Sequence, residues 1–227
     1  MVMLLEGRTR GFRVGLAYNR LREMIVRGTL TPGMRLVESE LMTQLDLGRT
    51  PIRSALHRLQ SEGFVVGTGK GKESLRVSPL TRADATDVFE IVGALESIAI
   101  RRAAALDRRT RAALATRMRQ RNAELARTAR APRPNPHRIY DIDAEIHRVF
   151  IEAGGGARVT RALATMKLQA ERYMRFYIQA FSDMRPSIAQ HARMARAIRA
   201  GDRDAAAAVV REQWEGAAAR LPTTIVY

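Results

Sequence analysis

Three ionisable side chains fall on the apolar faces of segments with helical periodicity, where charged groups are uncommon. Asp143 and His147 are four residues apart on the apolar stripe of 138–153, and His191 lies on the stripe of 187–200. Burying an unpaired ionisable group is costly, so these side chains need a shared partner. Two imidazoles and a carboxylate suit Zn²⁺, Ni²⁺, Mn²⁺ or Fe²⁺. The same spacing also fits a buried Asp–His ion pair beside a core histidine, and both interpretations stay open.

A fourth polar residue, Gln213, lies on the apolar stripe of 203–221. Its amide oxygen is a weak metal ligand, because it replaces the basic nitrogen that an imidazole would offer. A hydrolytic metal site would also need a general base beside the ligands, such as the Glu of H-E-x-x-H, and these segments lack one. We therefore expect a binding site rather than an enzyme.

A second set of polar residues has the spacing of a surface that reads DNA. Arg53, His57 and Gln60 follow one another at i, i+4 and i+7, opposite an apolar stripe, and Arg49 and Thr50 precede them. Arginine suits guanine O6 and N7, and threonine suits a phosphate or a thymine methyl group. An isolated basic helix would more often be an ordinary solvated face. The apolar stripe on the other side consists of Ile52, Ala55, Leu56 and Leu59.

The charge of the chain favours a polyanionic partner. Lys and Arg number 39 against 23 Asp and Glu, which gives a formal net charge of +16. Nucleic acid is the first candidate and an acidic membrane surface the second. The absence of cysteine excludes a disulfide framework and cysteine-rich zinc modules. No apolar run is long enough to cross a bilayer, and the start lacks a signal-peptide pattern, so we expect a cytoplasmic protein without membrane contact.

The elements that position the DNA-reading residues lie in the first 80 residues. Helical spacing, turn residues and two short β-rich runs alternate there in the order of a winged helix-turn-helix. Lys70 and Lys72 stand at the expected hairpin tip, where they could reach the DNA backbone or minor groove. The expected order is a helix through 14–25, a short helix capped by Ser39, a helix starting at Thr50-Pro51, and strands at 64–66 and 74–77.

From about residue 82 the chain is rich in Ala and Arg and almost entirely helix-periodic, which predicts an all-α bundle of six or seven helices. The run SPLTRAD (78–84) marks the boundary, with Thr81 as the expected N-cap. We therefore expect a DNA-binding domain in 1–80 and a ligand-binding and dimerisation domain in 81–227. In the first helix of the second domain, the residues expected to face inward are Val88, Ile91, Val92, Leu95, Ile98 and Ala99.

The segment 21–65 resembles the N-terminal domain of the GntR family of bacterial transcription regulators. The runs PGMRL, RTPIRSALHRL and EGFV stand in the order and spacing of that family. The resemblance implies a winged helix that binds an operator, most simply a palindromic one, as a homodimer. It also implies DNA contacts. The contact residues that we expect are Arg35, Arg49, Thr50, Arg53 and His57, with a looser match to the wing at Gly69, Lys70 and Gly71.

The second region resembles the FadR-type effector-binding domain, called FCD. The segments that carry the resemblance are DAEIHRVFIEAGG (143–155) and QHARMARAIRAGDRDAA (190–206). In metal-binding members an Asp and three His hold a divalent ion, and the effector is often a small carboxylate. This chain departs from the pattern at three positions. The third His is Gln213, an Arg of the first helix is Val92, and an Asn after the glycine is Gly156.

Together these features predict a transcription regulator whose operator affinity responds to a small effector, with a divalent metal as a second candidate ligand of the same domain. The expected metal ligands are Asp143, His147 and His191, with Gln213 in place of a third His. An architectural DNA-binding protein without an effector is the alternative, and flat binding across random DNA sites would distinguish it. The expected effector pocket consists of Val92, Arg102, Tyr173, Tyr177 and Gln213.

Overall fold

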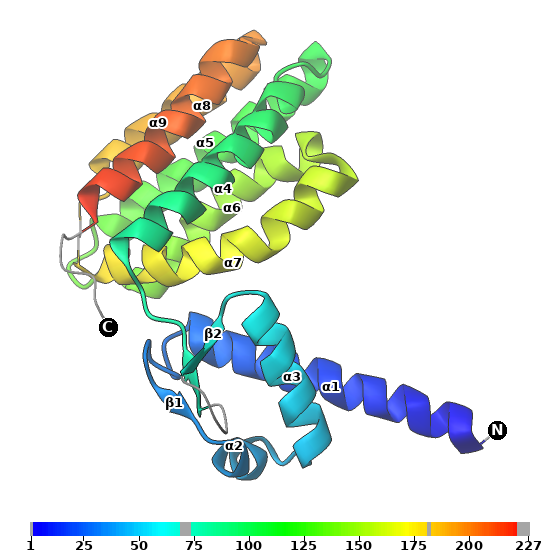
Figure 1. Cartoon of the computed structure of the whole chain (residues 1–227). Helices are drawn as coiled ribbons and strands as arrows, with labels where there is room; N and C mark the ends of the chain where they lie inside the picture. The colour runs from blue at the N-terminus through cyan, green and yellow to red at the C-terminus, as the bar shows by residue number, and fades with distance from the viewer. Residues whose placement is uncertain (1, 69–73, 181–182, 222–227) are drawn as a thin grey trace. The chain divides into compact units, whose positions relative to one another are not determined.

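The computed structural model describes residues 2–68, 74–180 and 183–221, without the side chains of 2–10, 68 and 176–180. The described chain forms two compact units, one ending at Thr81 and the other beginning at Arg82 (Figure 1). Within this part of the chain, no helix combines the length and the apolar character needed to cross a membrane.

The first unit is a three-helix domain with a small sheet, as the sequence predicts for a winged helix-turn-helix. Its helices are α1 (Val2–Val26), α2 (Glu38–Leu45) and α3 (Arg49–Ser61). Strands β2 (Val65–Thr68) and β3 (Ser74–Val77) form the expected antiparallel pair. A third strand, β1 (Arg35–Leu36), pairs with the other side of β3 and was not expected from the sequence. The core is built from apolar residues of all three helices, including Leu21, Leu41, Ile52, Leu56 and Leu59.

Three helix starts differ from the sequence expectation. Helix α1 begins at Val2, a dozen residues before the periodic stretch. Helix α2 begins at Glu38, so Ser39 lies inside it and the extended residue Val37 precedes it without a side-chain cap. Helix α3 begins at Arg49, which places Pro51 third in the helix. Proline is tolerated there because the first N–H groups of a helix have no partner inside it.

The second unit is an all-α bundle, as predicted. Asp107, Asn135 and Asp202 cap three of its helices by accepting hydrogen bonds from backbone N–H groups. Helix α4 packs against α6, α7 and α9, and α5 packs against α6 and α8 (Figure 1). The helices are α4 (Arg82–Ala103), α5 (Arg108–Ala129), α6 (Pro136–Gly154), α7 (Gly156–Ala180), α8 (Arg185–Ala200) and α9 (Arg203–Arg220).

The buried face of α4 is only partly the one expected. Val92 is among the residues that lie inside as predicted. Ile91 and Ile98 were also expected inside, but they are 45% and 40% exposed. Glu96 and Ser97, which were not expected inside, are buried. The inward position of Glu96 costs little because neighbouring helices supply three hydrogen-bond donors, which are described below. The expectation was wrong because α4 has apolar residues on two sides, and hydropathy alone cannot choose between them.

Two glycines near the junction of α6 and α7 have separate structural roles. At Gly154 a Cβ atom would lie 2.1 Å from the carbonyl oxygen of Ala99 and 2.6 Å from the backbone N of Ala103. Helices α4 and α6 therefore cross in backbone contact at this point. Gly156 has a φ of +66°, in the left-handed region that glycine adopts readily and asparagine tolerates. The replacement of the family Asn by Gly156 is therefore compatible with the local backbone.

Candidate functional site

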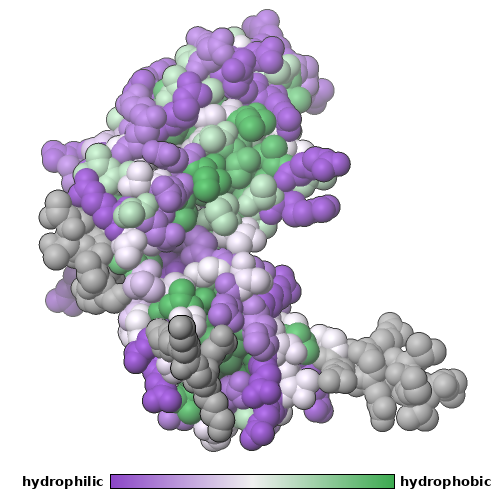
Figure 2. Space-filling model, viewed as in Figure 1, coloured by the Kyte–Doolittle hydropathy of each residue, from purple (hydrophilic) through white to green (hydrophobic). Residues whose placement is uncertain are grey.

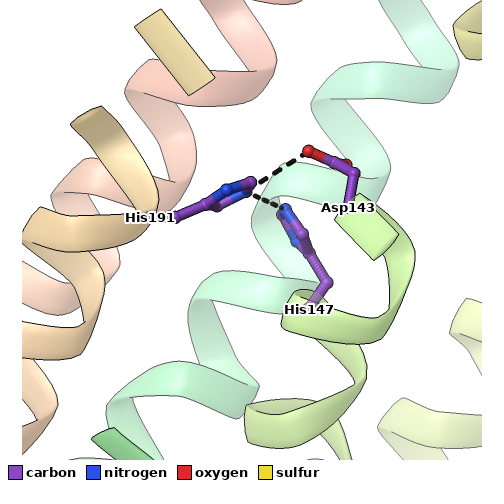
Figure 3. Close-up of side chains that lie close together, drawn as sticks. All are labelled: Asp143, His147 and His191. Atoms are coloured by element: carbon purple, nitrogen blue, oxygen red, sulfur yellow. Dashed lines mark hydrogen bonds and ion pairs between the residues drawn. The ribbon is translucent and has the colours of Figure 1, made fainter. Parts of the chain in front are cut away.

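The structure brings Asp143, His147 and His191 together inside the helical unit (Figure 3). One ligand atom from each residue lies within 4.8 Å of the others. The Nε2 atoms of the two imidazoles are 3.3 Å apart, and His191 Nε2 is 3.4 Å from Asp143 Oδ1. Asp143 and His147 come from one face of α6, and His191 comes from α8. All three side chains are buried.

Glu96 of α4 fixes the orientation of His147. Its carboxylate lies 2.7 Å from His147 Nδ1 and also accepts hydrogen bonds from Lys167 Nζ at 2.7 Å and Trp214 Nε1 at 2.8 Å. Burial raises the pKa of Glu96, but the charges of His147 and Lys167 lower it more, so the net pKa lies below its ordinary value. An ionised carboxylate can only accept. His147 Nδ1 therefore donates to Glu96, and this bond turns His147 Nε2 toward Asp143 and His191.

Asn122 of α5 orients His191 in the same way. The Asn122 side-chain N donates to the carbonyl oxygen of Ile188, which turns its Oδ1 toward His191 Nδ1 at 3.3 Å. Burial lowers the pKa of His191 to about 4, although the charge of Asp143 opposes this shift. His191 is therefore neutral at pH 7, with its proton on Nδ1 and its Nε2 lone pair facing the centre of the site.

The site consequently gathers atoms that can act as metal ligands. The Nε2 atoms of both imidazoles and Asp143 Oδ1 converge, and no described residue makes a hydrogen bond to this oxygen. The Gln213 side-chain N lies 3.1 Å from His191 Nε2 and is the nearest donor, while Gln213 Oε1 is buried without a described partner. A divalent cation satisfies such a set, and the outer contacts of Glu96 and Asn122 are those that orient histidine ligands. The residues present therefore fit a metal.

The residues expected to line an effector pocket are not all gathered around this site. Val92 is part of the core, and Tyr173 is buried with its hydroxyl donating to Asp84. Arg102 is exposed and donates to the carbonyl oxygen of Gly155 at 3.0 Å, about two turns along α6 from His147. The guanidinium of Arg102 therefore binds the C-terminal end of α6, away from the buried site. The side chain of Tyr177 lies outside the described residues. Gln213 is the member of the expected set for which a hydrogen bond to the site is seen.

The residues expected to contact DNA share one exposed surface of the first unit. Arg49, Thr50, Arg53 and His57 are exposed along α3, and Arg35 is exposed on β1. A cleft of about 500 Å³ between α3 and the sheet is lined by Arg35, Arg53 and His57. Lys70 and Gly71 lie outside the described residues. The side chains on α3 and β1 are therefore free to meet a ligand that enters this cleft.

Sequence reasoning missed Glu96, Asn122 and Lys167, the residues that orient the site from outside. Each lies on a different helix from the histidine or carboxylate that it supports. A polar residue at a position expected to be half-buried is a weak signal, and it becomes informative only when the partner helix is known. Glu96 could have been identified by a search for carboxylates on every face of α4.

Two family models match the chain. The model described as "Bacterial regulatory proteins, gntR family" matches residues 15–71, and the FCD domain model matches residues 87–216. These matches lie within the first and the second unit respectively.

Relatives with similar sequences are regulators. An HTH-type transcriptional regulator from the TAR-I ttuE-ttuC' intergenic region of Agrobacterium vitis is 35% identical over 95 residues, which is 42% of this chain and 54% of that protein. The chain thus spans about half the length of this relative. An HTH-type transcriptional regulator in an unstable DNA locus of Streptomyces ambofaciens is 29% identical over 82% of this chain and 75% of that protein.

Two solved structures share the fold of the chain. A GntR transcriptional regulator from Rhodococcus sp. RHA1 superposes with a TM-score of 0.68 and 19% identity, covering 92% of this chain and 96% of that one. McbR/YncC of E. coli superposes with a TM-score of 0.69 and 17% identity, covering 90% and 94%. The arrangement of a small DNA-binding fold followed by a helical bundle is therefore shared well beyond close relatives.

Proposed function

Because the chain belongs to the gntR family of bacterial regulatory proteins and carries its FCD domain, we propose that it is a cytoplasmic, metal-responsive transcription regulator. A homodimer would bind an operator through α3 and β1 of each copy. A divalent ion, together with a small effector, would bind in the helical unit and change the spacing of the two recognition helices, and so the operator affinity.

The convergence of acceptors around Asp143 carries this proposal. Asp143, His147 and His191 would hold the ion, with Gln213 as a fourth oxygen ligand or as a donor to a bound effector. A bound ion would supply a positive charge and open coordination positions for an anionic effector. Glu96 and Asn122 keep both imidazoles in the tautomer that can bind. The carboxylate chemistry of the effector follows from the family resemblance and is part of the proposal.

The response to metal tests the proposal directly. We expect operator affinity to differ between chelated protein and protein with Zn²⁺, Ni²⁺ or Mn²⁺. His147→Ala should abolish this difference, because it removes one ligand and leaves α3 untouched. The probe is a DNA duplex that the wild-type chain selects from a random pool, with binding followed by fluorescence anisotropy at fixed salt. His57→Ala, an imidazole outside the helical unit, is the matched control and should keep the response. Equal affinity with and without every metal would contradict the proposal, and failure to select any sequence would favour the architectural alternative.

The exposed apolar row on α4 supports a homodimer formed by the helical unit. Ile91 and Ile98 lie one above the other on the outer face of this helix, and Figure 2 shows hydrophobic residues gathered over α4. Covering the part of each isoleucine that is still exposed would stabilise an interface by roughly 1 kcal/mol, and a two-fold dimer repeats each contact. A second copy of the same helix would cover this row.

We expect Ile91→Glu with Ile98→Glu to make the chain monomeric at micromolar concentration, because each substitution places a charge in the proposed interface. Sedimentation velocity of the full chain measures the change. Ala112→Glu, on an exposed position of α5, adds the same type of charge elsewhere and should leave the dimer intact. A double variant that remains dimeric would place the interface on another face.

A further inference from the structure

An acidic residue stands within the basic surface that is proposed to read DNA. Glu38, the first residue of α2, pairs with Arg53 of α3: Arg53 Nε donates to Oε1 at 3.1 Å and Nη2 donates to Oε2 at 3.3 Å. The same cleft is lined by Arg35 and His57. A carboxylate repels DNA phosphates, so it weakens non-specific attraction at this position. A carboxylate at this position therefore needs another function that offsets the weaker attraction for DNA.

The geometry of the pair indicates what that role is. Glu38 occupies the Nε–Nη2 edge of the guanidinium and leaves the Nη1–Nη2 edge open. That open edge has the two parallel donors that match guanine O6 and N7. The Arg53 side chain is 59% exposed and that of Glu38 is 32% exposed, so the arginine stays accessible while the carboxylate is partly covered.

A free arginine in this cleft has two competing uses. It could bind a phosphate, which adds affinity for every sequence, or a base edge, which adds affinity for one. Holding the guanidinium by one edge lowers the entropy lost when it meets a base, because fewer rotamers remain to be fixed. A negative charge beside it also disfavours the phosphate alternative.

We propose that Glu38 is a specificity-determining residue, which positions Arg53 for a guanine and keeps phosphate out of the cleft between α3 and β1. This inference rests on the proposed role of Arg53 in reading DNA. It assigns to α2 a part in sequence selection although Glu38 itself need not touch a base.

The test compares two carboxylates of the same helical turn. Glu38→Gln and Glu40→Gln each remove one negative charge from the first turn of α2, and Glu40 is exposed and makes no described contact with Arg53. Both variants should bind a random-sequence duplex more tightly. Glu40→Gln should strengthen binding to the selected duplex by the same factor, whereas Glu38→Gln should lower the ratio of selected to random affinity about tenfold. Thermal melting of each variant shows that the fold is kept.

A second experiment removes the arginine. In an Arg53→Ala background, Glu38→Gln should no longer lower the ratio, because the group that it positions is gone. Equal ratios for Glu38→Gln and Glu40→Gln would overturn the inference, and so would an undiminished effect of Glu38→Gln without Arg53. If Arg53→Ala alone leaves the ratio at its wild-type value, the proposed DNA-reading role of Arg53 fails instead.

Discussion

Replacing Gly154 with alanine should destabilise the helical unit by about 3 kcal/mol or more. The added Cβ would lie 2.1 Å from the carbonyl oxygen of Ala99 and 2.6 Å from the backbone N of Ala103. Both atoms belong to the backbone of α4, so no side-chain rotation can relieve the overlap, and α4 and α6 must move apart. Urea unfolding followed by the fluorescence of Trp214 measures the loss, because this single tryptophan of the chain lies in the same unit.

Gly216→Ala is the matched control. A Cβ at Gly216 of α9 would meet the end of the Arg220 side chain at 3.4 Å, which can move aside. Alanine also favours a helix interior by about 1 kcal/mol over glycine, so this variant should be as stable as wild type or slightly more stable. If both variants have the same midpoint as wild type, the close crossing of α4 and α6 is not present in solution.

Gln213→His should raise the affinity for Zn²⁺ or Ni²⁺ at least about tenfold, because an imidazole is a far better ligand for these ions than a neutral amide. The position is suitable because the Gln213 side-chain N already lies 3.1 Å from His191 Nε2. Isothermal titration of chelator-treated protein with each ion gives the two affinities. Trp214 fluorescence, which depends on the bond to Glu96, gives an independent optical signal.

Two further variants are compared in the same titration, one as a control and one that should weaken metal binding. Gln120→His, on an exposed position of α5, adds a histidine away from the site and should leave the high-affinity binding unchanged. Glu96→Gln should weaken binding by about 10- to 100-fold, because a neutral amide replaces the charged acceptor that orients His147 and raises its basicity. Wild-type affinity in Gln213→His would mean that residue 213 does not reach the ion. No binding in any variant would refute the metal site itself.

The convergence of Asp143, His147 and His191 was largely predictable because these residues lie on strongly periodic helices. Asp143 and His147 share one face of α6 by their four-residue spacing, and His191 lies on the one clearly apolar side of α8. The inward faces of one bundle must meet at its core, so the residues converge. The gntR-type fold was predictable for the same reason, since its short helices and turns follow one another in a fixed order.

What could not be predicted depends on partners distant in the sequence. Glu96 is buried because Lys167, His147 and Trp214 surround it, and these lie 71, 51 and 118 residues away. Strand β1 is two residues long, too short for any alternation to appear. The pairing of Arg53 with Glu38 requires the angle between α2 and α3, which the turn sets. The bond from Arg102 to the carbonyl oxygen of Gly155 was not predictable either, because the sequence does not show which helix end this guanidinium meets.

The single carboxylate of Glu96 has a consequence for how the bundle fluctuates. One buried anion ties α4 to α6 through His147, to α7 through Lys167 and to α9 through Trp214. If any one of these helices opens, the buried Glu96 carboxylate loses one of its hydrogen-bond donors. The loss destabilises the packing of the remaining helices around this charge. Local opening of one helix is therefore as unfavourable as opening several together, and amide protons in the middle of these four helices should exchange with solvent in a single cooperative event. The helix that carries Asp143 and His147 is thus held in place by the protein's own side chains, which would preorganise the proposed site for a ligand.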